Sequence, residues 1–473
     1  MSTERLTDVR DTLYERMPQH RADLEALVRI PSVSAPSYDP AEVRRAAEAV
    51  RALLDARGLE HARLLEIEGA HPAVYADWLH AGAHAPTVLL YAHHDVQPPG
   101  DLLQWTTPAF EPAERDGRLF ARGAADDKAG VIAHVAAIDA WLRARGELPL
   151  NVKVIVEGEE ETGSAHLNAL ITAYADLLRA DVIVITDALN WKIGVPAITY
   201  LLRGLVDCEV EVKALDHALH SGIYGGPVPD PVTALIKVIA AATDAQGAVA
   251  IPGLDQAYEP TEDERARLYT LDFDVEAFRE EAGILNGVEL GGDPDLHPLE
   301  RLWMRPNLTV IGFDAPPVAG SSNTIVPSAR ARLSLRLAPG QDPDKARDVL
   351  CEWLRSHVPW GLHVEVIPGA TGQPFLADPT GDAFQAAGRA LEAAYGHPPV
   401  LIGAGGTIPF VEPFVTAFGG APALLLGVAD PDTRAHGTDE SLHLADWTNA
   451  CLAEVYLLAE LREALERAAE PGL

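Results

Sequence analysis

The sequence predicts an α/β fold: a mostly parallel sheet flanked by helices, with a smaller ferredoxin-like α+β domain inserted into it. Two observations favour this class. Helix-like and strand-like segments alternate from residue 41 to residue 186, and a different order of segments then interrupts this alternation until about residue 374. The length of 473 residues also exceeds what one ordinary core accommodates, which favours two or three domains.

The first region alternates helices and strands, a pattern typical of a parallel sheet covered by helices. Strand-like runs at 88–92 and 181–186 are continuously apolar, as expected for strands buried on both faces. The other elements that we expect here are helices at 41–57, 129–145 and 164–179 and a strand at 152–157.

A different order begins after Pro196. Residues 205–212 alternate apolar and polar side chains, which indicates a strand with one solvent-facing side. Asp342 and Pro343 suit the start of a later helix, as a capping side chain followed by proline at the first helical position. The resulting order is β-α-β-β-α-β, the ferredoxin-like pattern, with a helix at 230–243, strands at 307–312 and 329–338, a helix at 342–357 and a strand at 362–367.

Residues 247–305 are rich in Pro, Gly, Asp and Glu and show only weak periodicity, so we interpret them as an insertion. A helix expected at 382–395 and a strand expected at 423–428 return to the style of the first region. We therefore expect one domain formed by residues 1–198 and 374–473, and a second domain at 199–373 inserted into it.

Composition excludes several classes of protein. The 37 Lys and Arg residues stand against 70 Asp and Glu residues, and the net charge of −33 argues against nucleic acid or an anionic membrane as a partner. No apolar run approaches the ~20 residues of a membrane-spanning helix, and the first residues lack the pattern of a secretion signal, so we expect a cytoplasmic protein. The three cysteines are scattered, so any metal must be held by histidine and carboxylate side chains.

Acidic residues and histidines gather directly after the strand-like runs. Because loops at the carboxyl ends of strands in an open α/β sheet meet at one crevice, these residues can converge although they lie far apart in the chain. They form five clusters: His93 to Asp95, Asp126 and Asp127, Glu157 to Glu161, Asp187, and His436.

These clusters predict a site for two divalent metal ions. We assign His93 and Asp187 to one ion and Glu161 and His436 to the other, with Asp126 and a water shared by both. Each ion then has four ligands, the number that zinc prefers. Nitrogen and oxygen ligands suit manganese and cobalt as well, so zinc is the first expectation among three metals.

Two further acids complete the expected chemistry. Glu160 is adjacent to a proposed ligand, and we assign it as the general base that takes a proton from the shared water and passes it to the leaving nitrogen. Asp95 follows His93 by two residues and can accept the hydrogen bond of that imidazole's other N–H group, which orients the ring.

Each of these residues has an ordinary explanation when it is taken alone. His93 would more often be a buried or capping histidine, Asp187 a turn residue, and the run Glu157 to Glu161 a solvated face. Acids at four strand ends are not expected together by chance. A non-catalytic metal-binding protein on the same fold remains an alternative, because a fold does not determine a function.

The motifs resemble those of a known family of dinuclear zinc metallopeptidases. The segments that carry the resemblance are Tyr91 to Pro98, Arg122 to Lys128 and Glu157 to Ser164, and the likeness extends over nearly the whole chain. The family includes carnosinase-type dipeptidases, to which this chain is most similar, together with glutamate carboxypeptidase, succinyl-diaminopimelate desuccinylase and acetylornithine deacetylase. The resemblance implies a homodimeric amide hydrolase in which the inserted domain serves as lid and dimerisation domain.

By the same resemblance, the second domain contributes residues that act on the substrate. His220, in the segment Leu219 to Gly222, matches a histidine that reaches the active site of the partner subunit and polarises the scissile carbonyl. Asn323, Thr324 and Arg336 match positions that grip the substrate, and a guanidinium suits a carboxylate.

One segment departs from the dipeptidase pattern. Residues 403–406 read Gly-Ala-Gly-Gly, whereas dipeptidases usually have Arg-Glu-Gly-Gly, with the glutamate associated with the substrate's free amine. Ala404 therefore leaves two substrate classes open. The enzyme is expected to cleave either a small peptide, such as a dipeptide, or an N-acyl amino acid.

Overall fold

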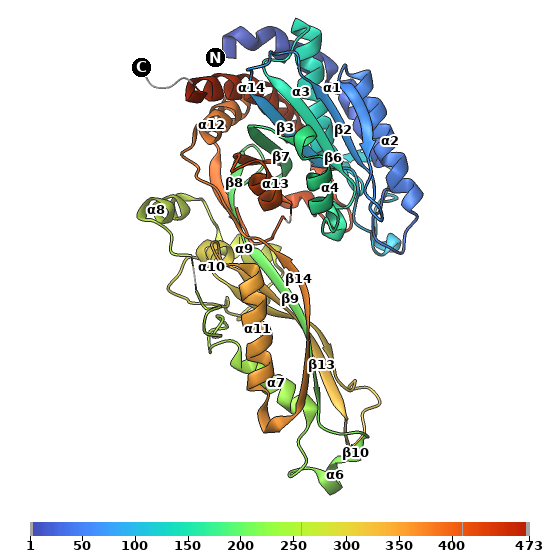
Figure 1. The fold of residues 1–473 in the computed structure, drawn as a ribbon, viewed down its shortest axis with the longest axis vertical. Helices are drawn as coiled ribbons and strands as arrows, with labels where there is room; N and C mark the ends of the chain where they lie inside the picture. The colour runs from blue at the N-terminus through green and yellow to red at the C-terminus, as the bar shows by residue number, and fades with distance from the viewer. Residues whose placement is uncertain (1–2, 257, 409, 470–473) are drawn as a thin grey trace. The chain divides into compact units, whose positions relative to one another are not determined.

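The computed structural model describes residues 3–256, 258–408 and 410–469. The chain divides into two compact units (Figure 1). Unit 1 consists of Met1–Tyr200, Ala377–Ile402 and Pro409–Leu473, and unit 2 of Leu201–Leu376 and Gly403–Ile408. The short segment Gly403–Ile408 thus groups with unit 2, although the sequence analysis places all of 374–473 in the first domain.

Unit 1 is built on a mixed sheet whose parallel pairings lie at its centre. Strands β6, β3, β7 and β17 pair parallel to one another in that order, whereas β1 with β2, β2 with β6, and β17 with β8 pair antiparallel. The sheet runs in the order β1 (Glu60–Leu65), β2 (Ala73–Trp78), β6 (Asn151–Glu157), β3 (Thr87–His93), β7 (Val182–Leu189), β17 (Ala423–Ala429) and β8 (Ala197–Leu202). Strands β15 (Phe375–Leu376) and β16 (Val400–Ala404) both pair with β8; β15 belongs to unit 2, and β8 and β16 each contain residues of both units. The predicted α/β class is confirmed.

Helices cover this sheet. The almost wholly buried α3 (Lys128–Arg145) packs against α1 (Thr7–Val28) and α14 (Leu444–Ala469), and α14 also packs against α12 (Asp382–Tyr395). Helix α2 (Pro40–Ala56) starts at Asp39, whose side chain accepts a hydrogen bond from the Ala41 N–H at 2.9 Å. The helix expected at 164–179 is two short helices, α4 (Leu167–Ala173) and α5 (Ala175–Leu178), because the backbone leaves the helical region at Tyr174.

Four shorter elements also belong to this unit: α13 (Val411–Ala417) and the strands of a small sheet in the order β18 (Ser441–His443), β5 (Arg118–Phe120) and β4 (Ala113–Arg115). None of the described helices is both long enough and apolar enough to cross a bilayer.

Unit 2 has the ferredoxin-like order that the sequence predicts. Its antiparallel sheet runs β11 (Asn307–Asp314), β13 (Ser328–Leu337), β9 (Gly204–Lys213), β14 (His363–Gly372), and carries α7 (Pro231–Ala241) and α11 (Pro343–His357). Along β9 and β13, apolar side chains that enter a buried core alternate with mostly polar side chains on the opposite, more exposed face. Asp342 caps α11 by accepting hydrogen bonds at 3.1 Å from the N–H groups of Asp344 and Lys345.

The predicted insertion between α7 and β11 contains three short helices separated by turns and irregular segments. These are α8 (Glu262–Thr270), α9 (Val275–Glu281) and α10 (Pro298–Met304). A second small element of unit 2 is a two-stranded ladder of β10 (Leu219–His220) with β12 (Thr324–Ile325), followed by α6 (Ser221–Tyr224).

Candidate metal centre

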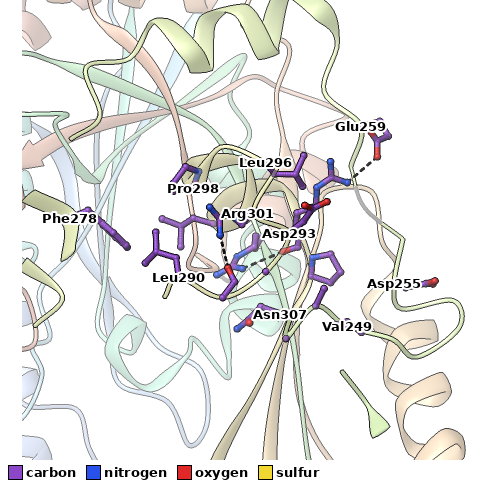
Figure 2. A pocket seen from close by; sticks show the side chains of 18 residues that line it. Val249, Asp255, Glu259, Phe278, Leu290, Asp293, Leu296, Pro298, Arg301 and Asn307 are labelled. Carbon is purple, nitrogen blue, oxygen red and sulfur yellow. Dashed lines mark hydrogen bonds and ion pairs between the residues drawn. The ribbon is translucent and has the colours of Figure 1, made fainter. Parts of the chain in front are cut away.

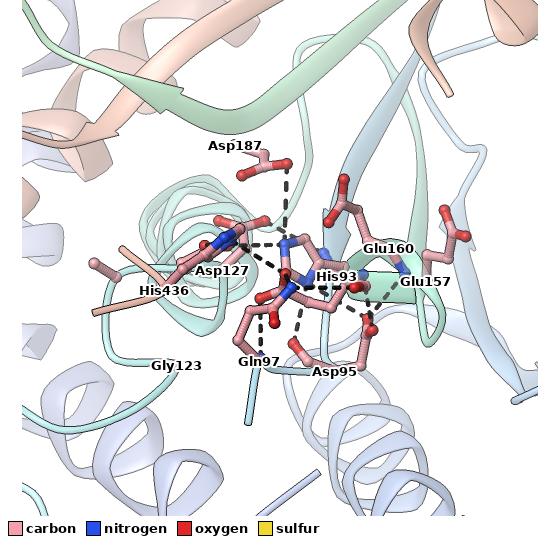
Figure 3. Close-up of polar contacts among 12 residues, drawn as sticks. His93, Asp95, Gln97, Gly123, Asp127, Glu157, Glu160, Asp187 and His436 are labelled. Atoms are coloured by element: carbon pink, nitrogen blue, oxygen red, sulfur yellow. Dashed lines mark hydrogen bonds and ion pairs between the residues drawn. The ribbon is translucent and has the colours of Figure 1, made fainter. Parts of the chain in front are cut away.

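The acidic side chains of the site come from one edge of the unit 1 sheet. His93 is the last residue of β3 and stands opposite Glu157, the last residue of the parallel strand β6. Asp187 lies in β7, which pairs parallel with β3 on its other side. Neighbouring parallel strands end at the same edge, so the side chains of His93, Asp187 and Glu160 lie close together (Figure 3).

Asp126 lies between the two histidines. Its Oδ1 is 3.1 Å from Nε2 of His93, and its Oδ2 is 3.0 Å from Nε2 of His436. Each carboxylate oxygen therefore faces a different imidazole. This is the arrangement required of a carboxylate that bridges two metal ions.

Six side chains form two groups that could each hold an ion. One group consists of His93, Glu160 and Asp187, and the other of Asp126, Glu161 and His436. Within each group the ligand atoms lie within 4.8 Å of one another. Imidazole nitrogen and carboxylate oxygen are donors that zinc and similar divalent metals accept, so the residues present fit the predicted cofactor.

The pKa shifts of the acidic residues also agree with a site for cations. Burial raises the pKa of Asp187 well above its ordinary value, and the nearby charges of Asp127 and Asp126 add to the effect. The pKa of Glu160 is likewise raised well above its usual value, by burial and then by Asp187 and Glu161. Such carboxylates are crowded without sufficient positive charge, which divalent ions would supply.

The two histidines compensate only part of this charge. Burial acts to raise the pKa of Asp126, but hydrogen bonding to His436 and His93 holds this pKa well below its usual value. Hydrogen bonding to Asp126 and Glu161 raises the pKa of His436 to about 10. Both shifts describe imidazolium–carboxylate pairs that a metal ion would replace.

Asp95 positions other residues of the site through hydrogen bonds. Its carboxylate accepts hydrogen bonds from the N–H groups of Glu160 at 3.2 Å and Glu161 at 3.0 Å, and from Oγ of Ser34 at 2.7 Å. Nδ1 of His93 is 3.1 Å from the backbone oxygen of Asp95 and 3.5 Å from its Oδ1. Asp95 thus positions the Glu160–Glu161 turn in addition to the His93 ring.

Gln97, which was not predicted as a site residue, orients a proposed ligand. Its Nε2 donates to Oε2 of Glu161 at 2.8 Å, and its backbone N–H donates to Oε1 at 3.1 Å. The position of Gln97 within the motif after β3 was the available signal.

Glu440 was also missed. It is fully buried, and its two oxygens accept hydrogen bonds from the N–H groups of Gly123, Ala125 and Asp126 at 2.8–3.1 Å and from Nη1 of Arg122 at 2.7 Å. The loop that carries Asp126 is therefore fastened to a side chain four residues after His436. Nothing in the local sequence around Glu440 marks this role.

Gly123 allows this loop to turn tightly. Its φ is +77°, and an added Cβ would lie 2.4 Å from Cγ1 of Val96. A larger residue would displace the backbone that leads to Asp126.

The remaining predicted site residues lie in unit 2. His220 pairs with Thr324 across the β10–β12 ladder, and the backbone oxygen of Asn323 accepts a hydrogen bond from the Ser221 N–H at 2.8 Å. The exposed His220 ring accepts a hydrogen bond at Nδ1 from the Gly222 N–H at 3.1 Å. These three predicted residues are close together.

Arg336 lies near the opposite end of the unit 2 sheet, on β13. Its Nη1 donates to Oγ1 of Thr407 at 3.1 Å. Burial lowers the pKa of Arg336. The segment Gly403–Ile408, which contains Ala404, is thus in contact with Arg336.

Comparison with known proteins agrees with the geometry. Residues 89–460 match the Peptidase family M20/M25/M40. The chain is 38% identical over 376 residues to the cysteinylglycine-S-conjugate dipeptidase of Corynebacterium striatum, covering 79% of this chain and 81% of that protein. It is 31% identical over 338 residues to the Beta-Ala-His dipeptidase of Rattus norvegicus, covering 70% and 68%.

Solved structures give the same result. The dipeptidase Dug1p from Saccharomyces cerevisiae has a TM-score of 0.82 and 25% identity, covering 97% of this chain and 98% of that one. The M20 metallo-carboxypeptidase Sso-CP2 from Sulfolobus solfataricus has a TM-score of 0.82 and 28% identity, covering 94% and 99%. The resemblance noted in the sequence is confirmed: the chain belongs to the Peptidase family M20/M25/M40 and is a metal-dependent hydrolase of peptide bonds.

Proposed function

We propose that the protein is a dipeptidase that works with two divalent ions, zinc in the first place and manganese or cobalt as alternatives. The placement of Asp126, with one oxygen toward His93 and the other toward His436, carries this proposal. Asp187 would complete the site of the first ion and Glu161 that of the second. When bound, the ions would polarise the scissile carbonyl and lower the pKa of the attacking water.

Glu160 is our choice for the general base. Burial raises its pKa, which favours a carboxylate that accepts a proton from water and returns it to the leaving amine. Because Glu160 also belongs to the first group of candidate ligands, its role needs a direct test. The variant Glu160→Gln should keep metal bound at both groups and lose activity by a factor of about 10²–10⁴. Loss of metal from the first group in parallel with activity would make Glu160 a ligand.

The dimensions of unit 2 support a homodimer. Strand β13 runs from Ser328, close to Asn323 and Thr324, to Leu337, so Arg336 lies eight residues further along and roughly 26 Å away. A dipeptide spans only about 7 Å. We infer that one subunit supplies Arg336 for the substrate carboxylate while the partner subunit supplies His220, Asn323 and Thr324. The predicted domains, 1–198 with 374–473 for catalysis and 199–373 as lid, accord with this division of labour.

The relatives named above support a dipeptide as substrate. They are described as acting on a cysteinylglycine conjugate and on Beta-Ala-His. Ala404 favours a second candidate, hydrolysis of N-acyl amino acids, because a methyl side chain offers no charge to a free ammonium group. The three described cysteines form no disulfide, which supports our placement of the enzyme in the cytoplasm.

Turnover of matched substrates by the metal-loaded protein tests these proposals. We would measure hydrolysis of Cys-Gly, β-Ala-His and Ala-Leu beside N-acetyl-Leu and N-succinyl-Leu. Faster cleavage of the free dipeptides supports dipeptidase activity, and faster cleavage of the acylated amino acids favours the deacylase. A protein that binds two ions and cleaves none of them would point to the non-catalytic alternative.

A further inference from the structure

A pocket of about 630 Å³ lies within unit 2, formed largely by the inserted segment (Figure 2). Its volume is in the range of small-molecule sites, ~300–1,000 Å³. Leu290, Leu296 and Leu302 contribute apolar walls, and three arginines also line it. None of the residues assigned above to metal binding or to catalysis lines this pocket.

Arg203, one of these arginines, is buried without a counter-ion. The residue is only 7% exposed. Its Nε donates to the Gly405 oxygen at 3.0 Å and its Nη1 to the Arg305 oxygen at 3.4 Å, both uncharged backbone acceptors. Within the described part of the chain, Nη2 has no hydrogen-bond partner and no carboxylate forms an ion pair with Arg203. Burying a cation in this way is unfavourable unless an anion accompanies it.

The other two arginines differ in whether nearby carboxylates form ion pairs with them. Arg305 is neutralised, because it forms ion pairs with Glu259 at 3.0 Å and Glu300 at 2.5 Å. Arg301 donates from Nη1 to the Gly291 oxygen at 2.9 Å, its buried Nε has no partner, and no described carboxylate pairs with it. Two guanidinium groups of the pocket, those of Arg203 and Arg301, thus form no ion pair with a described carboxylate, although Asp255 and Asp293 also line the pocket.

We propose that this pocket binds a small carboxylate with an apolar body. Arg203 and Arg301 would pair with the carboxylate, for which a guanidinium is suited in shape and charge, and the leucines would contact the body. Free amino acids, the products of peptide hydrolysis, have this chemistry, and Asp293 in the pocket wall could pair with their ammonium group. Naming amino acids as the natural ligand rests on the proposed function, whereas the carboxylate site does not.

Calorimetric titration of the metal-loaded protein tests this inference with three probes of similar size. Isocaproate has the carboxylate and the apolar body, leucine adds the ammonium group, and isoamylamine lacks the carboxylate. We expect isocaproate and leucine to bind and isoamylamine not to bind. Arg203→Met should weaken isocaproate binding about tenfold or more, the loss expected for one charged hydrogen-bonded pair.

Two further variants separate this pocket from the catalytic site and from misfolding. Ala248→Trp fills the pocket and keeps every charge, so it should also abolish isocaproate binding while the far-UV circular dichroism stays unchanged. Arg336→Met removes an arginine that does not line the pocket and should leave binding intact.

Three results would overturn the inference: no binding of isocaproate to the wild type at millimolar concentration, an affinity that is unchanged in both Arg203→Met and Ala248→Trp, or binding that disappears with Arg336→Met or on metal removal. Tighter binding of leucine than of isocaproate would support amino acids as natural ligands. Because these titrations do not depend on turnover, a failure of the proposed peptidase activity would be recognised separately.

Discussion

The carboxylate of Glu440 accepts a hydrogen bond from the backbone N–H of Asp126, with 3.1 Å between Oε1 and N. The same carboxylate accepts from Gly123 and Ala125, so one side chain holds the loop on which the proposed bridging ligand is mounted. Residues that orient metal ligands in this way usually affect metal affinity by a factor of about 10–100.

Replacing Glu440 should therefore weaken metal binding. In Glu440→Gln, one oxygen of the carboxylate becomes an NH₂ group that cannot accept the hydrogen bonds now made there. We expect the metal dissociation constant, measured with a competing chelator, to rise about 10–100-fold. At saturating metal, kcat should recover substantially. A loss of kcat that excess metal does not restore, with normal metal affinity, would contradict a positioning role.

Removal of metal should destabilise the protein as well as inactivate it. Without cations the crowded carboxylates of Asp187 and Glu160 are protonated or repel one another, as their raised pKa values indicate. Ligands that bind only the folded state raise its stability. We expect dialysis against a chelator to lower the midpoint of thermal unfolding, and zinc, manganese or cobalt to restore it. Equal midpoints with and without metal would count against a bound pair of ions.

Mixing two inactive variants tests whether active sites are shared between subunits. Glu160→Gln removes the proposed base, and His220→Ala removes the histidine proposed to act on the partner's substrate. In a mixed dimer, the site on the His220→Ala subunit would have its own Glu160 and the partner's His220. After subunit exchange we expect about a quarter of wild-type activity. As controls, each variant is taken alone through the same exchange procedure. If the mixture regains no activity, His220 acts in the active site of its own subunit.

His20 should make stability depend on acid. Its imidazole is buried in α1, and burial lowers its pKa from 6.5 to about 4. Between pH 6.5 and pH 4 the unfolded chain therefore binds a proton that the folded chain does not, so the free energy of unfolding falls as the pH falls. At pH 7 both states are neutral and this contribution is absent.

The variant His20→Leu removes this effect. We compare the free energy of unfolding of the variant with that of the wild type at each pH. This difference should shift in favour of the variant by on the order of 3 kcal/mol as the pH falls from 7 to 4. Urea denaturation of both proteins at several pH values measures the difference, in which contributions from other groups cancel. Parallel pH dependences would show that His20 does not titrate as described.

Features that depend on short stretches of chain could be predicted from the sequence. The apolar runs of β3 and β7 and the polar residues after them, such as His93, mark both strands and ligands locally. The ferredoxin-like order could also be predicted, because buried and more exposed residues alternate along β9 and β13 and because Asp342 caps α11.

Features that depend on distant contacts could not be predicted in this way. Glu440 contacts Gly123 across 317 residues, and an isolated glutamate has no pattern that announces such a role. Arg203 and Arg301 could not be recognised because their lack of ion pairs is visible only when every neighbouring side chain is placed. Helix α1 was also missed; its weak amphipathic pattern includes Pro18 inside the helix.

The six residues Gly403–Ile408 have a consequence for any attempt to isolate unit 2. A fragment cut out as Leu201–Leu376 would lack the Thr407 hydroxyl that Arg336 contacts and the Gly405 oxygen that Arg203 contacts. The fragment would also lose the packing of Trp303 against Gly403. This contact is so close that a Cβ added to Gly403 would lie 2.7 Å from the Trp303 ring. A faithful excised version would need this hexapeptide grafted back through a new covalent connection.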